Sequence, residues 1–302
     1  MRVVSLNLRA MPNRNIAKLE PLADLLDSFH PDVVMLQECR AGWLEYICTR
    51  VGLTGVRAHD LLGDVGGLPA DGTAVAVRAP LRITHASTLA AEDFAPDAIH
   101  VLIGPDTLPR YSELPDALVA RFRARSLIAE ISGAGRQFAA CSFHAAPGTG
   151  RYGPKPGKLV HEYKPFFHGG AGAALSRLSD PFIFAIDANE PKSETLEQVA
   201  FHWADGRTGA RKMGALLGLQ PVHPARDLQR EQLKITGAPA ASESYLALTY
   251  TTHNGSARGG RRFDSMWATP EFGLQMFSTH YQAALDAGTD HALLVADLEP
   301  AA

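Results

Sequence analysis

A carboxylate and an amide stand at the end of one strongly apolar stretch. Residues 182–186 are five consecutive apolar residues, which predicts a strand buried on both faces, and Asp187 and Asn189 follow it. Residues two apart on a strand share a face, so we expect both side chains to project together at the strand's carboxyl end. A desolvated carboxylate beside an amide suits metal binding or the activation of a water molecule. The alternative is that the two residues only begin a turn.

Polar residues follow other expected strands as well. Asn7, Glu38 and His144 each come at the end of an alternating or apolar segment. Asp290 and His291 are adjacent, and neighbours on a regular strand face opposite sides of the sheet. Both can serve one site only at the irregular start of a strand, which is a common position for functional residues.

The order of the expected elements favours an α/β fold. A strand over residues 2–8, a helix over 16–29 and a strand over 32–38 form a crossover unit, whose functional residues gather at one edge of the sheet. Gly133 and Gly135 predict a hairpin between two strands. The strands are expected at residues 71–78, 81–85, 126–131, 137–143, 182–186, 246–252, 262–268, 274–279 and 292–298, and the other helices at 43–51, 115–122, 171–178, 194–200 and 212–219.

Three segments show no clear periodicity. Residues 89–125 are punctuated by prolines, and we expect an insertion with one helix. Residues 145–170 are rich in Gly, Pro and Lys and are expected to form a loop, whereas the polar residues 220–244 give no assignment. Because no repeat or linker divides the chain, residues 1–302 are expected to form one domain.

The composition favours a soluble, cytoplasmic protein. The hydrophobic share of 46% is ample for a core, and the three cysteines have no metal-binding spacing, which fits reduced thiols. The first residues do not resemble a signal peptide, and no apolar run approaches the ~20 residues that span a membrane. The formal net charge of −3 means that any nucleic-acid surface would be local. No obligate protein partner is evident.

Short motifs occur in the order found in one known superfamily. They are Ser5-Leu6-Asn7, Leu36-Gln37-Glu38, Ser142-Phe143-His144, Ile186-Asp187-Ala188-Asn189, Arg262-Phe263-Asp264-Ser265-Met266-Trp267 and Thr289-Asp290-His291. Together they resemble the endonuclease/exonuclease/phosphatase superfamily, over residues 3 to 298. The resemblance implies a DNase I-like α/β (α+β) fold, a four-layer sandwich of two packed mixed β-sheets flanked by helices. It also implies hydrolysis of phosphate esters with Mg²⁺, for which Mn²⁺ is able to substitute.

The resemblance also implies roles for the residues of a metal and water site. Glu38 would bind the metal, with Asp290 as a second ligand and Asn7 nearby. Asp187 would orient or deprotonate the attacking water, and Asn189 would hold that water or a phosphate oxygen.

The remaining site residues would act on the phosphate itself. Asp264 would hydrogen-bond His291, fixing its tautomer and keeping it cationic. His144 would contact another non-bridging oxygen or assist the leaving group. Taken singly, each has a structural alternative: Glu38 as a solvated strand end, Asp264 as a surface charge and His144 as a core histidine.

The substrate is the least determined part of the assignment. A nuclease acting on DNA or RNA is favoured, with Lys155, Lys158 and Arg261 binding phosphates, although a solvated loop around Arg261 is the alternative. A phosphatase or phosphodiesterase for a small-molecule or lipid-headgroup phosphate fits the acidic balance, and a binding protein without turnover is a third hypothesis. Arg9 occupies a position where some nucleases of the superfamily carry an acid, which argues against a second metal site near it.

Overall fold

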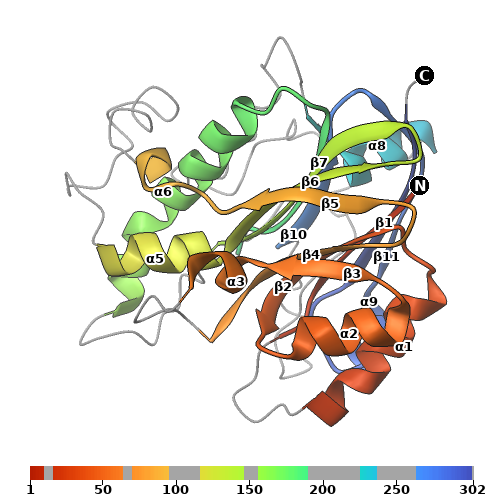
Figure 1. Ribbon diagram of the computed structural model, residues 1–302, viewed down its shortest axis with the longest axis horizontal. Helices are drawn as coiled ribbons and strands as arrows, with labels where there is room; N and C mark the ends of the chain where they lie inside the picture. The colour runs from red at the N-terminus through yellow and green to blue at the C-terminus, as the bar shows by residue number, and fades with distance from the viewer. Residues whose placement is uncertain are drawn as a thin grey trace.

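In the part of the chain that the structure describes, two six-stranded sheets pack face to face, and helices cover their outer faces (Figure 1). The computed structural model describes residues 1–9, 16–63, 70–94, 116–145, 156–189, 225–236 and 263–300. Within these ranges the layers run helices, sheet, sheet, helices, and the expected DNase I-like fold class is confirmed.

The first sheet contains both ends of the described chain. Its strands, from edge to edge, are β11 (Phe272–His280), β12 (Leu293–Pro300), β1 (Arg2–Asn7), β2 (Val33–Arg40), β4 (Asp71–Val77) and β3 (Thr54–Arg57). β1 and β2 are parallel, and the crossover that a parallel pair requires includes η1 (Ile16–Leu19) and α1 (Glu20–Ser28). The expected strand–helix–strand unit is therefore confirmed.

The second sheet is built in the same way around a second parallel pair. Its strands are, in order, β5 (Arg82–Ser87), β6 (Ser126–Gly133), β7 (Arg136–His144), β8 (Phe182–Asp187), β10 (Asp264–Ala268) and β9 (Arg226–Asp227). β7 and β8 are parallel, and their connection includes α6 (Pro156–Ser176). β6 and β7 form the expected hairpin, in which Ala134 and Gly135 have φ values of 53° and 73°, the left-handed pair that a tight hairpin turn needs.

Three apolar clusters hold the layers together. The central cluster lies between the sheets and includes Val3, Met35 and Ile183. The outer cluster of the first sheet packs against α1, α2 (Trp43–Val51) and α9 (Tyr281–Asp286). The outer cluster of the second sheet packs against η2 (Ala91–Phe94), α5 (Asp116–Ala124) and α6. Because β8 is buried on both faces, its sequence is apolar from Phe182 to Ile186 and ends at Asp187.

One expectation about the connections is wrong. Residues 156–170, expected in a loop, belong to α6, because Phe167, Ala171 and Ala174 recur at helical spacing and bury one face in the core. Three short elements had no clear signal: β3, α3 (Ala58–Leu62) and α9. Within 220–244 the structure adds β9 and α8 (Leu228–Ile235). The expected elements at residues 194–200, 212–219 and 246–252 lie outside the described residues.

Candidate active site

Three strands of the second sheet bring polar side chains into one row. His144 on β7 lies opposite Asp187 on β8, and Asp264 on β10 lies opposite the same aspartate. Opposite residues on paired strands present their side chains on the same face. All three are buried, with exposed fractions of 2%, 1% and 4% in that order. This row forms the floor of the candidate site.

A bulge in the first sheet turns Glu38 toward the row. The pairing of β2 with β4 shifts register between Leu36 and Cys39, and Glu38 has a left-handed φ of 54°. A non-glycine residue in this region costs ~1–3 kcal/mol and persists only where its surroundings hold it. Bulges next to functional sites commonly re-aim a side chain. Here the bulge directs the Glu38 carboxylate across the gap between the sheets.

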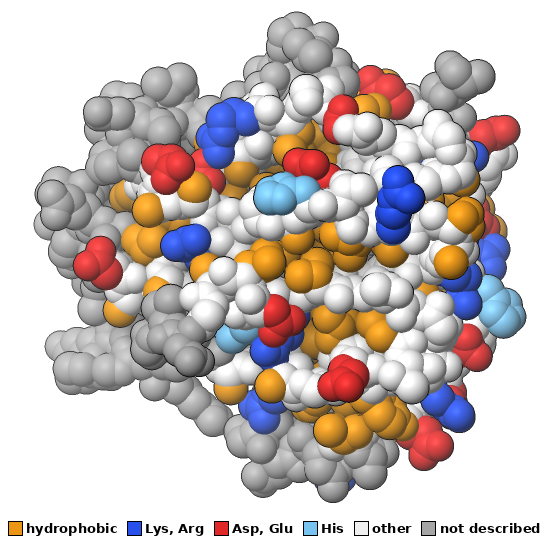
Figure 2. Space-filling model, in the orientation of Figure 1, with side chains coloured by type: hydrophobic (Ala, Val, Ile, Leu, Met, Phe, Trp, Pro, Cys, Tyr) orange, Lys and Arg blue, Asp and Glu red, His pale blue; other side chains and the backbone are white. Residues whose placement is uncertain are grey.

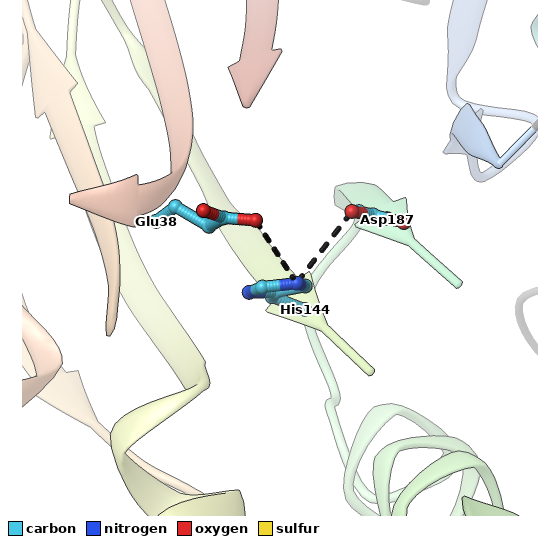
Figure 3. Close-up of side chains that lie close together, drawn as sticks. All are labelled: Glu38, His144 and Asp187. Carbon is cyan, nitrogen blue, oxygen red and sulfur yellow. Dashed lines mark ion pairs between the residues drawn. The ribbon is translucent and has the colours of Figure 1, made fainter. Parts of the chain in front are cut away.

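The carboxylates of Glu38 and Asp187 approach the same nitrogen of the His144 ring from two directions (Figure 3). The His144 Nε2 is 3.7 Å from Glu38 Oε1 and 3.5 Å from Asp187 Oδ2. One ligand atom from each residue lies within 4.8 Å of the other two. Two carboxylate oxygens and an imidazole nitrogen this close together could hold a divalent cation.

Asn7 connects the two carboxylates from the end of β1. Its Nδ2 donates to Asp187 Oδ2 at 2.9 Å and to Glu38 Oε1 at 3.3 Å. Its Oδ1 accepts the backbone N–H of Arg9 at 2.8 Å, which fixes the orientation of the amide. Thr289 donates its hydroxyl to the Asn7 carbonyl at 2.7 Å and so ties the start of the Asp290 segment to β1.

Asp187 has an unusual environment for a carboxyl group. Burial raises its pKa from 3.8 to about 7, and the negative charge of Asp264 adds to the rise, whereas the positive charge of His291 opposes it. A carboxyl group that titrates near neutral pH is suited to act as a general base.

Asp264 and His291 form a buried pair beside Asp187. The Nδ1 of His291 lies 2.9 Å from Asp264 Oδ2 and 3.1 Å from Oδ1. Burial lowers the pKa of His291, but the charge and hydrogen bond of Asp264 outweigh that effect and raise the pKa to about 10. The Nε2 of the ring lies 4.0 Å from Asp187 Oδ2, so the imidazolium turns its other edge toward the row.

Asn189 is placed differently from the expectation. It lies beyond the end of β8 with a φ of 51°, so it does not share a strand face with Asp187. Its backbone N–H donates to Asp187 Oδ1 at 2.9 Å, and its Nδ2 donates to the Ala145 carbonyl at 2.7 Å. Asp187 and Asn189 therefore do begin a turn, which was the alternative interpretation of the sequence. The same turn also holds the carboxylate of Asp187 in place.

Asp290 is buried beside His291 and forms a salt bridge. Its Oδ2 is 3.3 Å from Arg9 Nε, and its Oδ1 is 4.0 Å from His291 Nε2. Asp290 and His291 precede β12 in irregular backbone, as expected. Arg9 brings a cation into the site, and the sequence marked it only as a departure from the superfamily pattern. Its position two residues after Asn7 was the available signal.

The expected substrate-binding residues are not brought into this site by the described part of the chain. Lys155 and Arg261 lie outside the described residues. Lys158 lies in the first turn of α6, and its side chain is not described.

Comparison with known proteins agrees with this architecture. Residues 4–138 match the model of the Endonuclease/Exonuclease/phosphatase family. An AP endonuclease from Archaeoglobus fulgidus has a TM-score of 0.62 at 15% identity, over 99% of this chain and 99% of that one. Humanized TDP2 from D. rerio has a TM-score of 0.60 at 17% identity, over 99% and 98%. A mannosyl-6-phosphatase from Bacteroides thetaiotaomicron has a TM-score of 0.57 at 16% identity, over 99% of both chains. No curated protein sequence matches significantly.

The fold, and a cluster of residues that could hold a metal ion, are features expected of a metal-dependent phosphoester hydrolase. The family match over residues 4–138 and the shared fold make the chain similar to the endonuclease/exonuclease/phosphatase superfamily.

Replacing Glu38 by glutamine tests the proposed ligand. Glu38→Gln should raise the Mg²⁺ concentration needed for half-maximal activity by about 10-fold or more, since one ligand charge is lost. The melting temperature should change little, because the side chain is 24% exposed and the amide has the same shape. Glu45→Gln on α2 is the matched control and should change neither quantity. An unchanged Mg²⁺ titration for Glu38→Gln would show that Glu38 is not a ligand.

Proposed function

We propose that this protein hydrolyses phosphodiester bonds with the help of a divalent cation and acts on nucleic acid. The observation that supports this most strongly is the convergence of Glu38, His144 and Asp187 with the Asp264–His291 pair. Cleavage of a phosphate ester requires neutralised charge, an activated water and a stabilised leaving oxygen. The residues of this site offer a group for each requirement.

The donor set fits a hard cation such as Mg²⁺. Mg²⁺ prefers oxygen ligands and usually takes one or two carboxylates while it keeps several waters. Glu38 supplies the carboxylate ligand, and one ligand atom each of Asp187 and His144 lies within 4.8 Å of it, close enough to act on a water or a phosphate beside the cation. When bound, the cation supplies positive charge that neutralises the phosphate and stabilises the leaving oxygen. Asn7 donates to both carboxylates, so we assign it to their alignment, and its oxygen could bind metal only by releasing the Arg9 N–H.

Each remaining residue has a role that follows from its contacts. Asp187, with its pKa raised to about 7, accepts a proton from the attacking water near neutral pH, and Asn189 holds its other oxygen. His291 stays cationic against Asp264 and stabilises negative charge on the phosphate. His144 donates to a phosphate oxygen or to the leaving group.

Asp290 has two candidate roles. It could reach a cation as a second ligand, or it could hold Arg9 toward the phosphate. The present salt bridge to Arg9 favours the second role.

A nucleic-acid substrate is supported by the similar proteins. One structure of D. rerio TDP2, with a TM-score of 0.56, contains a single-stranded DNA product, and the Archaeoglobus fulgidus protein is an AP endonuclease. Arg9, in its salt bridge with Asp290, offers a guanidinium that suits a phosphate of an extended chain.

A small-molecule phosphate is the second candidate, and the surface favours it. On the face that carries β5 and β3, Lys and Arg are dispersed among Asp and Glu and do not form a continuous basic stripe (Figure 2). The formal net charge is −3, and one similar protein is a mannosyl-6-phosphatase. No described helix is long and apolar enough to cross a membrane.

A parallel assay separates these candidates. Single-stranded DNA, plasmid DNA, RNA, bis-p-nitrophenyl phosphate and a sugar phosphate should be incubated with the protein and Mg²⁺, with Asp187→Asn as the control for contaminating nucleases. Cleavage of a nucleic acid at a kcat/KM well above that of bis-p-nitrophenyl phosphate supports the proposal. Turnover of the sugar phosphate alone would contradict it.

Substitution of three lysines tests for a binding surface around α6. If Lys155, Lys158 and Lys164 contact a nucleic-acid backbone, replacing all three by alanine should weaken the salt dependence of binding. The slope of log K against the logarithm of the salt concentration should become less negative by roughly two. Turnover of bis-p-nitrophenyl phosphate should barely change. The double variant Lys18→Ala/Lys234→Ala is the control for a simple loss of charge. Equal loss on long and small substrates would indicate damaged structure, and no loss on either would favour a small substrate.

A further inference from the structure

A buried polar cluster lies directly beneath the candidate site. It consists of Ser5 on β1, Gln37 on β2 and Ser142 on β7, with exposed fractions of 3%, 1% and 0%. Ser5 and Ser142 each stand two residues before a site residue on the same strand, and Gln37 directly precedes Glu38. Side chains two apart on a strand share a face, so the two serines form the layer under the site.

Gln37 connects both sheets through this cluster. Its Nε2 donates to Ser142 Oγ at 3.1 Å and to Ser5 Oγ at 3.3 Å. Ser142 in turn donates its hydroxyl to the Leu36 carbonyl at 2.9 Å. The Gln37 carbonyl accepts the Leu8 N–H at 3.0 Å. The backbone of Gln37 is thus bonded to the residue that follows β1. Its side chain is bonded to Ser5 in the first sheet and to Ser142 in the second sheet.

The residue that follows Gln37 needs such an anchor. Glu38 lies in the bulge where the pairing with β4 shifts register, and its φ of 54° is costly for a side chain of this size. A strained conformation persists only where neighbouring contacts over-determine it. The side-chain bonds of Gln37 to Ser142 also tie β2 to the strand that carries His144. The separation of Glu38 from His144 therefore depends on this cluster.

We propose that Gln37 is a positioning residue that, through Ser142, sets the place of the Glu38 carboxylate and thereby the affinity of the site for a divalent cation. This inference rests on the proposed function, because it takes Glu38 to be a cation ligand. A purely structural cluster would affect stability alone. A positioning cluster affects cation affinity and leaves the rate at saturating cation largely intact.

Binding of Mn²⁺ to the purified full chain, measured by calorimetry without substrate, tests the role directly. Gln37→Leu keeps the volume but removes the amide, and it should raise the Kd for Mn²⁺ by about 10-fold, while kcat at saturating Mn²⁺ stays within about 3-fold. Ser142→Ala removes one hydrogen-bond partner and should raise the Kd by about 3-fold or more, which serves if Gln37→Leu does not fold. The Kd for Mn²⁺ of the double variant should be no higher than that of Gln37→Leu, because the two residues act as one unit.

Thr269→Val is the matched control. Thr269 is also fully buried, and its Oγ1 accepts the Phe182 N–H at 3.2 Å, at the opposite end of β8. Loss of this hydrogen bond in Thr269→Val should lower the melting temperature without changing the Kd for Mn²⁺. Wild-type affinity in Gln37→Leu, or an equal change in Thr269→Val, would overturn the positioning role alone. Failure of the wild-type protein to bind Mn²⁺ would instead contradict the proposed function, and the role of Gln37 with it.

Discussion

Asp187→Asn is expected to lower kcat by at least ~10³-fold, within the range lost when a positioned acid–base group is removed. Asp187 contacts Asn7 and the Asn189 N–H, and its Oδ2 lies 3.5 Å from His144 Nε2. An amide keeps the shape of the carboxylate but cannot accept the proton of an attacking water. The measurement is single-turnover cleavage over a full Mg²⁺ titration. Activity that recovers at high Mg²⁺ would make Asp187 a ligand and not the base.

The same variant should remain folded, for an electrostatic reason. The folded-state pKa of Asp187 is about 7 against a usual 3.8, so its contribution to stability is lost as the pH rises from about 4 to about 7. At pH 8 the buried carboxylate destabilises the fold, and a neutral amide removes that effect. The melting temperature of Asp187→Asn at pH 8 should therefore equal or exceed that of the wild type. A cooperative transition lost altogether would mean that the activity loss reflects unfolding.

Asp264→Asn and His291→Ala should each lower activity by about 10²-fold or more, and the double variant should be little worse. The two residues lie in direct contact at 2.9 Å, and His291 depends on Asp264 for its charge. Kinetics of the single variants and the double variant measure their coupling. Losses that multiply in the double variant would show that the two residues act independently.

The pH profile of the Asp264→Asn variant should change in a defined direction. With its pKa raised to about 10, His291 keeps its proton through neutral pH, and wild-type activity should fall only as the pH rises through about 10. Without the Asp264 carboxylate the pKa of His291 falls, so the alkaline limb should move to lower pH. The kcat/KM measured from pH 6 to pH 10.5 checks this. An alkaline limb that does not move would remove Asp264 from this role.

Much of the fold followed from local sequence patterns. The apolar run before Asp187 predicted a strand buried on both faces, and the glycines around Ala134 predicted a hairpin, and both are present. The helix at residues 156–170 was missed because its apolar face becomes clear only when Phe167 and Ala171 are seen to pack on the second sheet. In the sequence this periodicity is weak, and the Gly and Pro residues of the segment favoured a loop instead.

The sequence by itself determined which strands exist and which polar residues stand at their ends. Hydrophobic periodicity is local, so the motifs that contain Asn7, Asp187 and His291 could be assigned to strand ends without tertiary information. Their order then gave the resemblance to the superfamily. The tertiary structure decided how these residues interact, because contacts between sheets depend on register and on irregular backbone. The bulge that turns Glu38 toward His144 and the salt bridge between Arg9 and Asp290 join segments distant in sequence, and no local pattern encodes those distances.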